Sequence, residues 1–176
     1  MAHAAVAITV FCRLRGSLLL DLTASVLVRR GRPPAAGLFS LPGGKIRRGE
    51  PLLTAATREA REELGLDVAA VLLDGGVPSF AATDAVSESH HFVIAHVCGW
   101  VWEAEGGGLP ALAAGDDAAA ALWVRAPWRR GEGLGAGLLH PRSLALAGPV
   151  EAVLCAAQRV GDAENAQRAG GGGTLI

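Results

Sequence analysis

Three glutamates lie close together in the sequence, at positions 59, 62 and 63. At about 100° per residue, these spacings place Glu59, Glu62 and Glu63 on one arc of a helix. Like charges at such spacings destabilise an isolated helix by about 0.2–0.5 kcal/mol per pair. A hard divalent cation such as Mg²⁺ prefers grouped carboxylate oxygens and would offset this repulsion. The spacing alone leaves two interpretations: a metal site, or a solvated acidic face on which Arg58 and Arg61 offset part of the repulsion.

Residues on either side predict where this helix begins and ends. Pro51 suits the first turn of a helix and Gly65 suits its left-handed end, while Gly43 and Gly44 after Pro42 mark a tight loop. The apolar residues of the stretch share an adjoining arc, which consists of Leu52, Leu53, Ala56, Ala60 and Leu64. We therefore predict a helix of about four turns with an apolar side and an acidic edge.

The stretch 44–66 resembles the Nudix box, in which a glycine, a glutamate and an Arg-Glu-rich helix recur at fixed spacing. The residues that match in register are Gly44, Glu50, Arg58, Glu59, Glu62, Glu63, Gly65 and Leu66. Ala60 is smaller than the commonest aliphatic residues at its position but remains apolar. A weaker similarity, to bacterial ADP-ribose pyrophosphatase-like Nudix enzymes, extends over residues 4–124. The resemblance favours the metal site over the solvated acidic face.

The resemblance implies a fold and a set of residue roles. The expected fold is α/β, an α/β/α sandwich built on a mixed sheet with one catalytic helix and a C-terminal helix. Mg²⁺, with Mn²⁺ as a substitute, would neutralise a diphosphate and activate water. By motif position, the expected metal ligands are the carboxylates of Glu59, Glu62 and Glu63 and the main-chain carbonyl of Gly44. Glu50 and Arg58 would brace the loop against the helix, and Gly65 would end it.

A further carboxylate is expected outside the box. In related Nudix enzymes, a loop before the strand that ends in Trp-Val brings an acidic residue over the metal ions. Asp117, or failing it Asp116, occupies this position, and Glu103 and Glu105 are weaker candidates. The alternative is that the aspartate caps the loop through main-chain amides.

Residues that flank the box are candidates for substrate binding. A polyphosphate needs positive charge beyond the metal, and the basic candidates are Arg29, Arg30, Arg32 and Lys45. A purine ring needs an aromatic platform, and the chain has no tyrosine. Phe39 and Phe80 are the candidates carried forward, with Trp123 and Trp128 also available. Solubility for the arginines and core packing for the aromatic residues are the alternatives.

Three function classes fit a Nudix box. A hydrolase of a nucleoside diphosphate derivative, with ADP-ribose cleaved to AMP and ribose phosphate, is the expected one. A sanitising hydrolase of oxidised nucleoside triphosphates is the alternative, because such enzymes share the box. A Nudix-fold sensor would have lost box carboxylates, which this chain retains. An RNA-end hydrolase would need an extended basic channel, which the sequence lacks.

Composition bounds the remaining options. The formal net charge of −1 excludes a global field that attracts nucleic acid or an anionic membrane. Cys12, Cys98 and Cys155 are too widely spaced for a zinc site and suggest a reducing compartment. We expect a cytoplasmic protein that binds a small nucleotide and neither nucleic acid nor membrane, and a homodimer is left open.

The order of elements follows from apolar patterning and turn residues. We predict one Nudix domain over residues 1–165 and a disordered Gly-rich tail over 166–176. Strands are expected at 4–12, 25–28, 68–73, 90–102 and 118–124, with the first two paired, a short extended segment at 38–41 and a loop at 83–89. A helix is expected at 144–160. The apolar stretch 18–22 has no assigned role.

Overall fold

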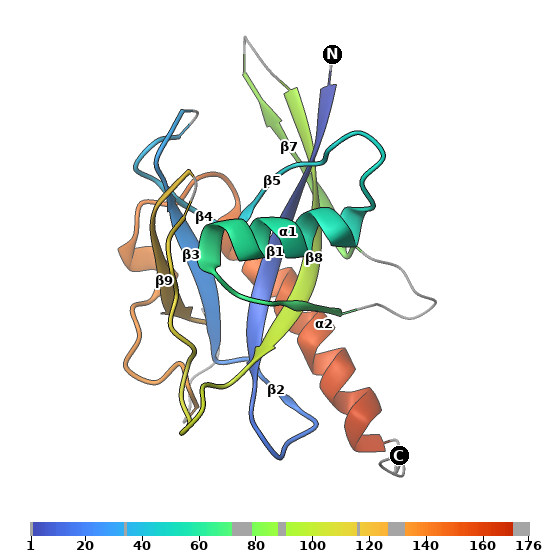
Figure 1. Cartoon of the computed structure of the whole chain (residues 1–176), viewed down its shortest axis with the longest axis vertical. Helices are drawn as coiled ribbons and strands as arrows, with labels where there is room; N and C mark the ends of the chain where they lie inside the picture. The colour runs from blue at the N-terminus through green and yellow to red at the C-terminus, as the bar shows by residue number, and fades with distance from the viewer. Residues whose placement is uncertain are drawn as a thin grey trace.

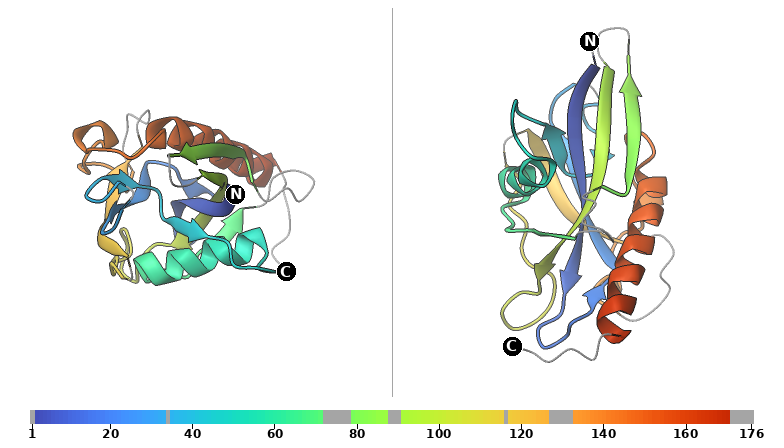
Figure 2. Two further views of the ribbon diagram at one scale, coloured as in Figure 1. Left: turned by 90° about the horizontal axis from the view of Figure 1, so that it is seen from above. Right: turned by 90° about the vertical axis from the view of Figure 1, so that its right-hand side faces the viewer.

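Two helices lie on opposite sides of a layer of strands (Figures 1 and 2). Helix α1 spans Leu52–Leu64 and helix α2 spans Val150–Gly170. The computed structural model describes residues 2–33, 35–71, 79–87, 91–115, 117–126 and 133–170. The right-hand view of Figure 2 shows that α1 covers one face of the strands and α2 covers the other. The predicted α/β/α sandwich is therefore confirmed.

The larger sheet is mixed and is centred on two long parallel strands. Strand β1 (Ala2–Arg13) pairs with β8 (His91–Trp102) along its whole length. The other strands run antiparallel to these two: β2 (Leu20–Asp21) and β5 (Gly43–Lys45) pair with β1, while β6 (Ala69–Val71) and β7 (Ala81–Val86) pair with β8. Because β5 is hydrogen-bonded to β1, the loop before α1 is held on the central strand.

The smaller sheet contains strands β4 (Phe39–Ser40), β3 (Ala24–Arg30) and β9 (Ala118–Arg125), in that order and antiparallel. The prediction that strands 4–12 and 25–28 pair with each other is wrong, because β1 and β3 belong to different sheets. Strand β1 has one edge occupied by β8 and the other by β5 and β2, so β3 pairs with β9 instead.

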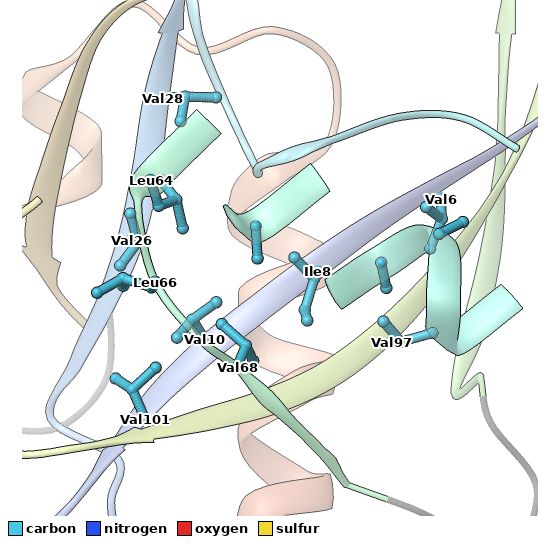
Figure 3. Packing of buried hydrophobic residues seen from close by; sticks show 13 residues of the cluster. Val6, Ile8, Val10, Val26, Val28, Leu64, Leu66, Val68, Val97 and Val101 are labelled. Carbon is cyan, nitrogen blue, oxygen red and sulfur yellow. The ribbon is translucent and has the colours of Figure 1, made fainter. Parts of the chain in front are cut away.

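The core on either side of the sheet follows from the alternation of side chains along each strand. On the α1 side, Val6, Ile8 and Val10 of β1 meet Val97 and Val101 of β8 (Figure 3). The helix adds its buried residues Ala55, Ala56, Ala60 and Leu64. On the α2 side, the intervening residues Ala7 and Phe11 belong to clusters that include Val153, Leu154 and Ala157 of α2. The small alanines of α1 allow its backbone to lie close to the strands.

Several predicted boundaries differ from the structure. Helix α2 begins at Val150, after Pro149, and not at 144, because residues 141–143 form a separate 3₁₀ turn. It then continues through residues 166–170 of the predicted tail, while 171–176 lie outside the described residues. The predicted loop 83–89 is wrong over 83–86, since β7 is held there by pairing with β8 despite its alanines and aspartate. Strand β6 covers 69–71 of the predicted strand 68–73.

Within the described ranges, neither helix combines the length and apolar content that a membrane span requires.

The core under α1 generates a stability prediction. Leu64 is 0% exposed in the last turn of α1, whereas Leu139 is 57% exposed in a loop. We expect Leu64→Ala to lower the free energy of unfolding by about 2–5 kcal/mol, because it leaves a cavity in the core. Leu139→Ala is the matched control and should change it by about 0.5 kcal/mol or less. Urea denaturation followed by circular dichroism measures both, and equal losses would contradict this packing.

Candidate active site

The acidic helix α1 has well-defined ends. Pro51 is its N-cap residue, and Gly65 ends it in the left-handed conformation with φ 68°. The Gly65 N–H donates to Arg61 O, as the predicted C-terminal glycine requires. Glu59, Glu62 and Glu63 lie in the second half of the helix, next to the loop that β5 carries.

Strand β5 brings Gly44 against the side chain of Glu59. A Cβ atom added at Gly44 would lie 2.6 Å from Glu59 Oε1, so a side chain there would displace the Glu59 carboxylate from its position. Glu59 is buried, and this burial raises the pKa of its carboxyl while the Arg58 guanidinium opposes part of the rise. A partly desolvated carboxylate with a raised pKa is a feature that functional sites share.

The Arg58 side chain joins three glutamates and the β5 loop. Its Nη1 donates to Glu59 Oε1 at 2.7 Å and to Glu62 Oε2 at 3.0 Å. Its Nε and Nη2 donate to the two oxygens of Glu50 at 2.8 and 3.0 Å, and Nη2 also donates to Lys45 O at 3.1 Å. The loop from β5 to α1 is thus tied to the helix by one guanidinium, whose own pKa these partners raise.

Glu50 remains ionised in this arrangement. The hydrogen bonds from Arg58, together with one from the Arg47 main-chain N–H at 2.9 Å, lower the pKa of Glu50 to about 2. Since Glu50 accepts at both oxygens, it holds the guanidinium in a fixed orientation towards Glu59 and Glu62.

Two contacts of the glutamates were not predicted from the sequence. The Gly43 main-chain N–H donates to Glu63 Oε2 at 2.9 Å, and Arg47 Nη2 lies 3.3 Å from Glu62 Oε1. The Nudix pattern specifies Gly44 and not its neighbour. A signal for Gly43 was nevertheless present, because two glycines in succession before an acidic helix leave their main-chain amides open to approach by a carboxylate.

The donor set suits a divalent cation. In the arrangement that the structure shows, the described residues contain no group of three His, Cys, Asp or Glu side chains that is ready to hold a metal ion. Glu59 and Glu62 instead share one cationic nitrogen, Arg58 Nη1. Two carboxylates that already meet at a positive charge offer the oxygen ligands that a hard cation requires. Such a cation would compete with Arg58 for these oxygens.

The structure brings two further predicted site residues together. Arg32 Nη1 lies 2.9 Å from Asp117 Oδ1, and the Gly31 N–H donates to Asp117 O at 2.8 Å. Arg32 is 73% exposed at its side chain, so it can reach a ligand from the loop after β3. Arg29 and Arg30 end β3, and Arg29 Nε donates to Gly37 O at 3.2 Å. Asp116 lies outside the described residues.

Lys45 lies apart from the glutamates. Gly44 pairs with Val6, whose side chain belongs to the core under α1, so the next residue, Lys45, faces the other side of the sheet. Its Nζ lies 5.5 Å from the centre of the Phe92 ring. Only the main-chain carbonyl of Lys45 takes part in the Arg58 contacts.

The two predicted aromatic platforms also lie away from the glutamates. Phe39 and Phe80 pack against the buried cluster on the α2 side. Core packing is the alternative role that the sequence left open for both. Phe39 is held there because its main chain bonds to the segment at Ala145 and Ala147. Trp123 packs against the α1-side cluster, and Trp128 lies outside the described residues.

The Arg58 contacts generate a second prediction. Arg58→Gln leaves Glu50, Glu59 and Glu62 without their shared cation, so we expect a loss of about 3 kcal/mol in the free energy of unfolding. Added Mg²⁺ should restore part of this loss, since a cation can replace the guanidinium between two carboxylates.

The matched control is Arg61→Gln, because Arg61 lies on the same helix and forms only an exposed ion pair with Asp67. That variant should lose about 1 kcal/mol or less and show no extra response to Mg²⁺. Thermal unfolding of both variants with EDTA and with Mg²⁺ is the measurement. An Mg²⁺ response that is the same in both would contradict the inferred cation position.

Comparisons with known proteins agree with this geometry. The sequence model of the NUDIX domain matches residues 2–127. A Mycobacterium tuberculosis H37Rv protein named "Putative 8-oxo-dGTP diphosphatase 2" is 44% identical over 54 residues, which cover 31% of this chain and 38% of that relative. The chain therefore matches well under half the length of this relative.

Solved structures show the same fold. A Caenorhabditis elegans Ap4A hydrolase in a binary complex aligns with a TM-score of 0.61 at 12% identity, over 89% of this chain and 96% of that one. The NUDIX domain of Shewanella oneidensis NrtR, complexed with ADP ribose, aligns with a TM-score of 0.58 at 16% identity, over 90% of this chain and 88% of that one. Since the NUDIX domain model covers most of the chain and the box residues lie together on α1 and its preceding loop, the chain belongs to the Nudix family.

Proposed function

We propose that the chain is a divalent-metal-dependent pyrophosphohydrolase that cleaves a diphosphate linkage in a nucleoside diphosphate derivative. The observation that carries the proposal is that Glu59 and Glu62 meet at one cationic nitrogen, Arg58 Nη1, with Gly44 close to the Glu59 carboxylate. Nudix family members generally use divalent metal ions. Retention of every box carboxylate favours hydrolysis over binding alone.

The proposed metal is Mg²⁺, with Mn²⁺ as a substitute, held by Glu59, Glu62, Glu63 and the Gly44 carbonyl. When bound, such an ion neutralises phosphate charge and lowers the pKa of water. The protein's own part is to gather these carboxylates: Arg58 bonds to one oxygen of Glu59 and one of Glu62, which the cation would take over, and the Gly43 N–H bonds to Glu63. The raised pKa of Glu59 suits a carboxylate that works in a partly dry site.

The proposed substrate is ADP-ribose, which water would split into AMP and ribose phosphate. Support comes from sequence segments mostly outside the box, where residues 30–45 and 115–124 are similar to the ADP-ribose pyrophosphatase-like branch. Arg32, exposed in the loop after β3, is the proposed contact for a phosphate oxygen, and Arg29 and Arg30 at the end of β3 are proposed as further positive charges. Asp117, its ion-pair partner, is the proposed additional carboxylate.

A second candidate is an oxidised nucleoside triphosphate, cleaved to the monophosphate. The specific support is the M. tuberculosis relative, whose name refers to 8-oxo-dGTP and whose matched segment is 44% identical. Both candidates share the diphosphate chemistry and differ in the group that the loops outside the box must recognise.

A test of the metal ligands follows. Glu63→Gln keeps the size of the side chain and removes its charge, so we expect turnover at saturating Mg²⁺ to fall about a hundredfold or more with the fold intact. Glu151→Gln, on the opposite side of the sheet in α2, is the charge-matched control and should retain turnover. Chromatographic measurement of the mononucleotide released from a panel of nucleotides gives both turnovers, and near-normal turnover of Glu63→Gln would remove that residue from the site.

The substrate proposal has its own test. The value of kcat/KM should be higher for ADP-ribose, with AMP and ribose phosphate as products, than for 8-oxo-dGTP cleaved to its monophosphate. Chromatographic separation of the products with matched Mg²⁺ and substrate concentrations gives the ratio. A reversed ratio would transfer the assignment to the second candidate while leaving the diphosphate chemistry in place.

A further inference from the structure

We propose that residues 109–115, here called the strap, position the last turn of α1 and thereby the glutamates that hold the metal. Gly115 is the residue that sets the distance between the strap and that turn. This inference rests on the proposed function and adds to it a positioning element outside the Nudix box. The strap lies between β8 and β9 in the sequence and runs past the C-terminal end of α1.

The strap contacts the end of α1 through main-chain atoms. The Ala113 N–H donates to Leu64 O at 2.9 Å. A Cβ atom added at Gly115 would lie 2.6 Å from Glu62 O, and one added at Gly65 would lie 3.1 Å from Ala113 Cβ. The contact at Gly115 is with a main-chain atom and leaves no room for a side chain, whereas the contact at Gly65 is tight and Gly65 is glycine because of its φ of 68°.

Both ends of the strap are fastened to rigid elements. Trp123 Nε1 of β9 donates to Pro110 O at 2.9 Å, and Leu112 packs against the core under α1. After the strap, the Ala118 N–H donates to Gly115 O at 3.0 Å at the start of β9. The strap is thus a braced segment whose position β9 determines.

The last turn of a helix needs such a partner. Its final carbonyl groups accept no hydrogen bond from within the helix, and helix ends fray unless other groups bond to them. In α1 this turn carries Glu62 and Glu63. Their carboxylates are held by Arg58 of the same helix, by Arg47 and by the Gly43 N–H, the last two from the segment that precedes α1. The strap holds their main chain from the other end, so both sides fix where the oxygens lie.

The test uses two changes that loosen the strap by different means. Gly115→Ala inserts a methyl group against Glu62 O, and Trp123→Phe removes the donor to Pro110 O while keeping an aromatic ring in the core. Gly170→Ala, where an added Cβ meets nothing within 4 Å, is the control for the first change. Trp102→Phe, on the exposed end of β8, is the control for the second.

Three quantities are measured on the full chain. These are the Kd for Mn²⁺ without substrate, the hydrogen–deuterium exchange rate of the amides of residues 61–65, and the Mg²⁺ concentration for half-maximal hydrolysis. We expect both strap variants to raise the Kd for Mn²⁺ about tenfold, to speed exchange at 61–65 and to raise the Mg²⁺ requirement. The two controls should match the wild type in all three.

The outcomes separate this inference from the proposed function. Unchanged metal affinity in both strap variants overturns it, even where thermal stability falls, because a merely structural role moves stability alone. Shifts that the controls share overturn it as well. If the wild type binds Mn²⁺ but cleaves no nucleotide, the proposed function fails while Kd and exchange still decide the role of the strap. If the wild type binds no Mn²⁺, the positioning of metal ligands is overturned together with the proposed site.

Discussion

One guanidinium determines the local arrangement of this site. Arg58 bonds to Glu50 with two nitrogen atoms and to Glu59 and Glu62 with the third. Without it, the carboxylates at spacings of three and four would repel one another and the loop before α1 would lose its tie to the helix. The raised pKa of Arg58 and the lowered pKa of Glu50 express the same mutual stabilisation. The rest of the fold holds α1 and the β5 loop close enough for Arg58 to bond to both.

This arrangement depends on the close approach of α1 to the strands beneath it. Gly44 brings β5 against the Glu59 carboxylate, and Ala55, Ala56 and Ala60 allow α1 to lie near β1 and β8. Larger side chains at these positions would lift the helix away and separate the carboxylates from the loop. The acidic edge and the small-residue face of α1 therefore serve one arrangement, in which the charges lie at the border between core and solvent.

Local features of this protein could be predicted from the sequence, and long-range ones could not. The bounds of α1 follow from Pro51 and Gly65 acting on their own neighbours, so the predicted helix is confirmed. The pairing of 4–12 with 25–28 was wrong because partner choice depends on β8, which lies about ninety residues along the chain, and apolar alternation does not identify a partner. The side of the sheet that Lys45 faces depends on the register between β5 and β1, where a shift of one residue would reverse it.

The parallel pairing of β1 with β8 affects how the protein is made. Helix α1 packs on β1, and β1 is bonded along its whole length to residues 91–102. During synthesis, which proceeds from the N-terminus, the first strand and the acidic helix emerge well before the strand that completes their sheet. Contacts of such large sequence separation form slowly, because a long loop must close before they stabilise anything. A nascent chain that ends before residue 91 therefore carries every residue of the Nudix box and still lacks the strand that completes the sheet beneath its site.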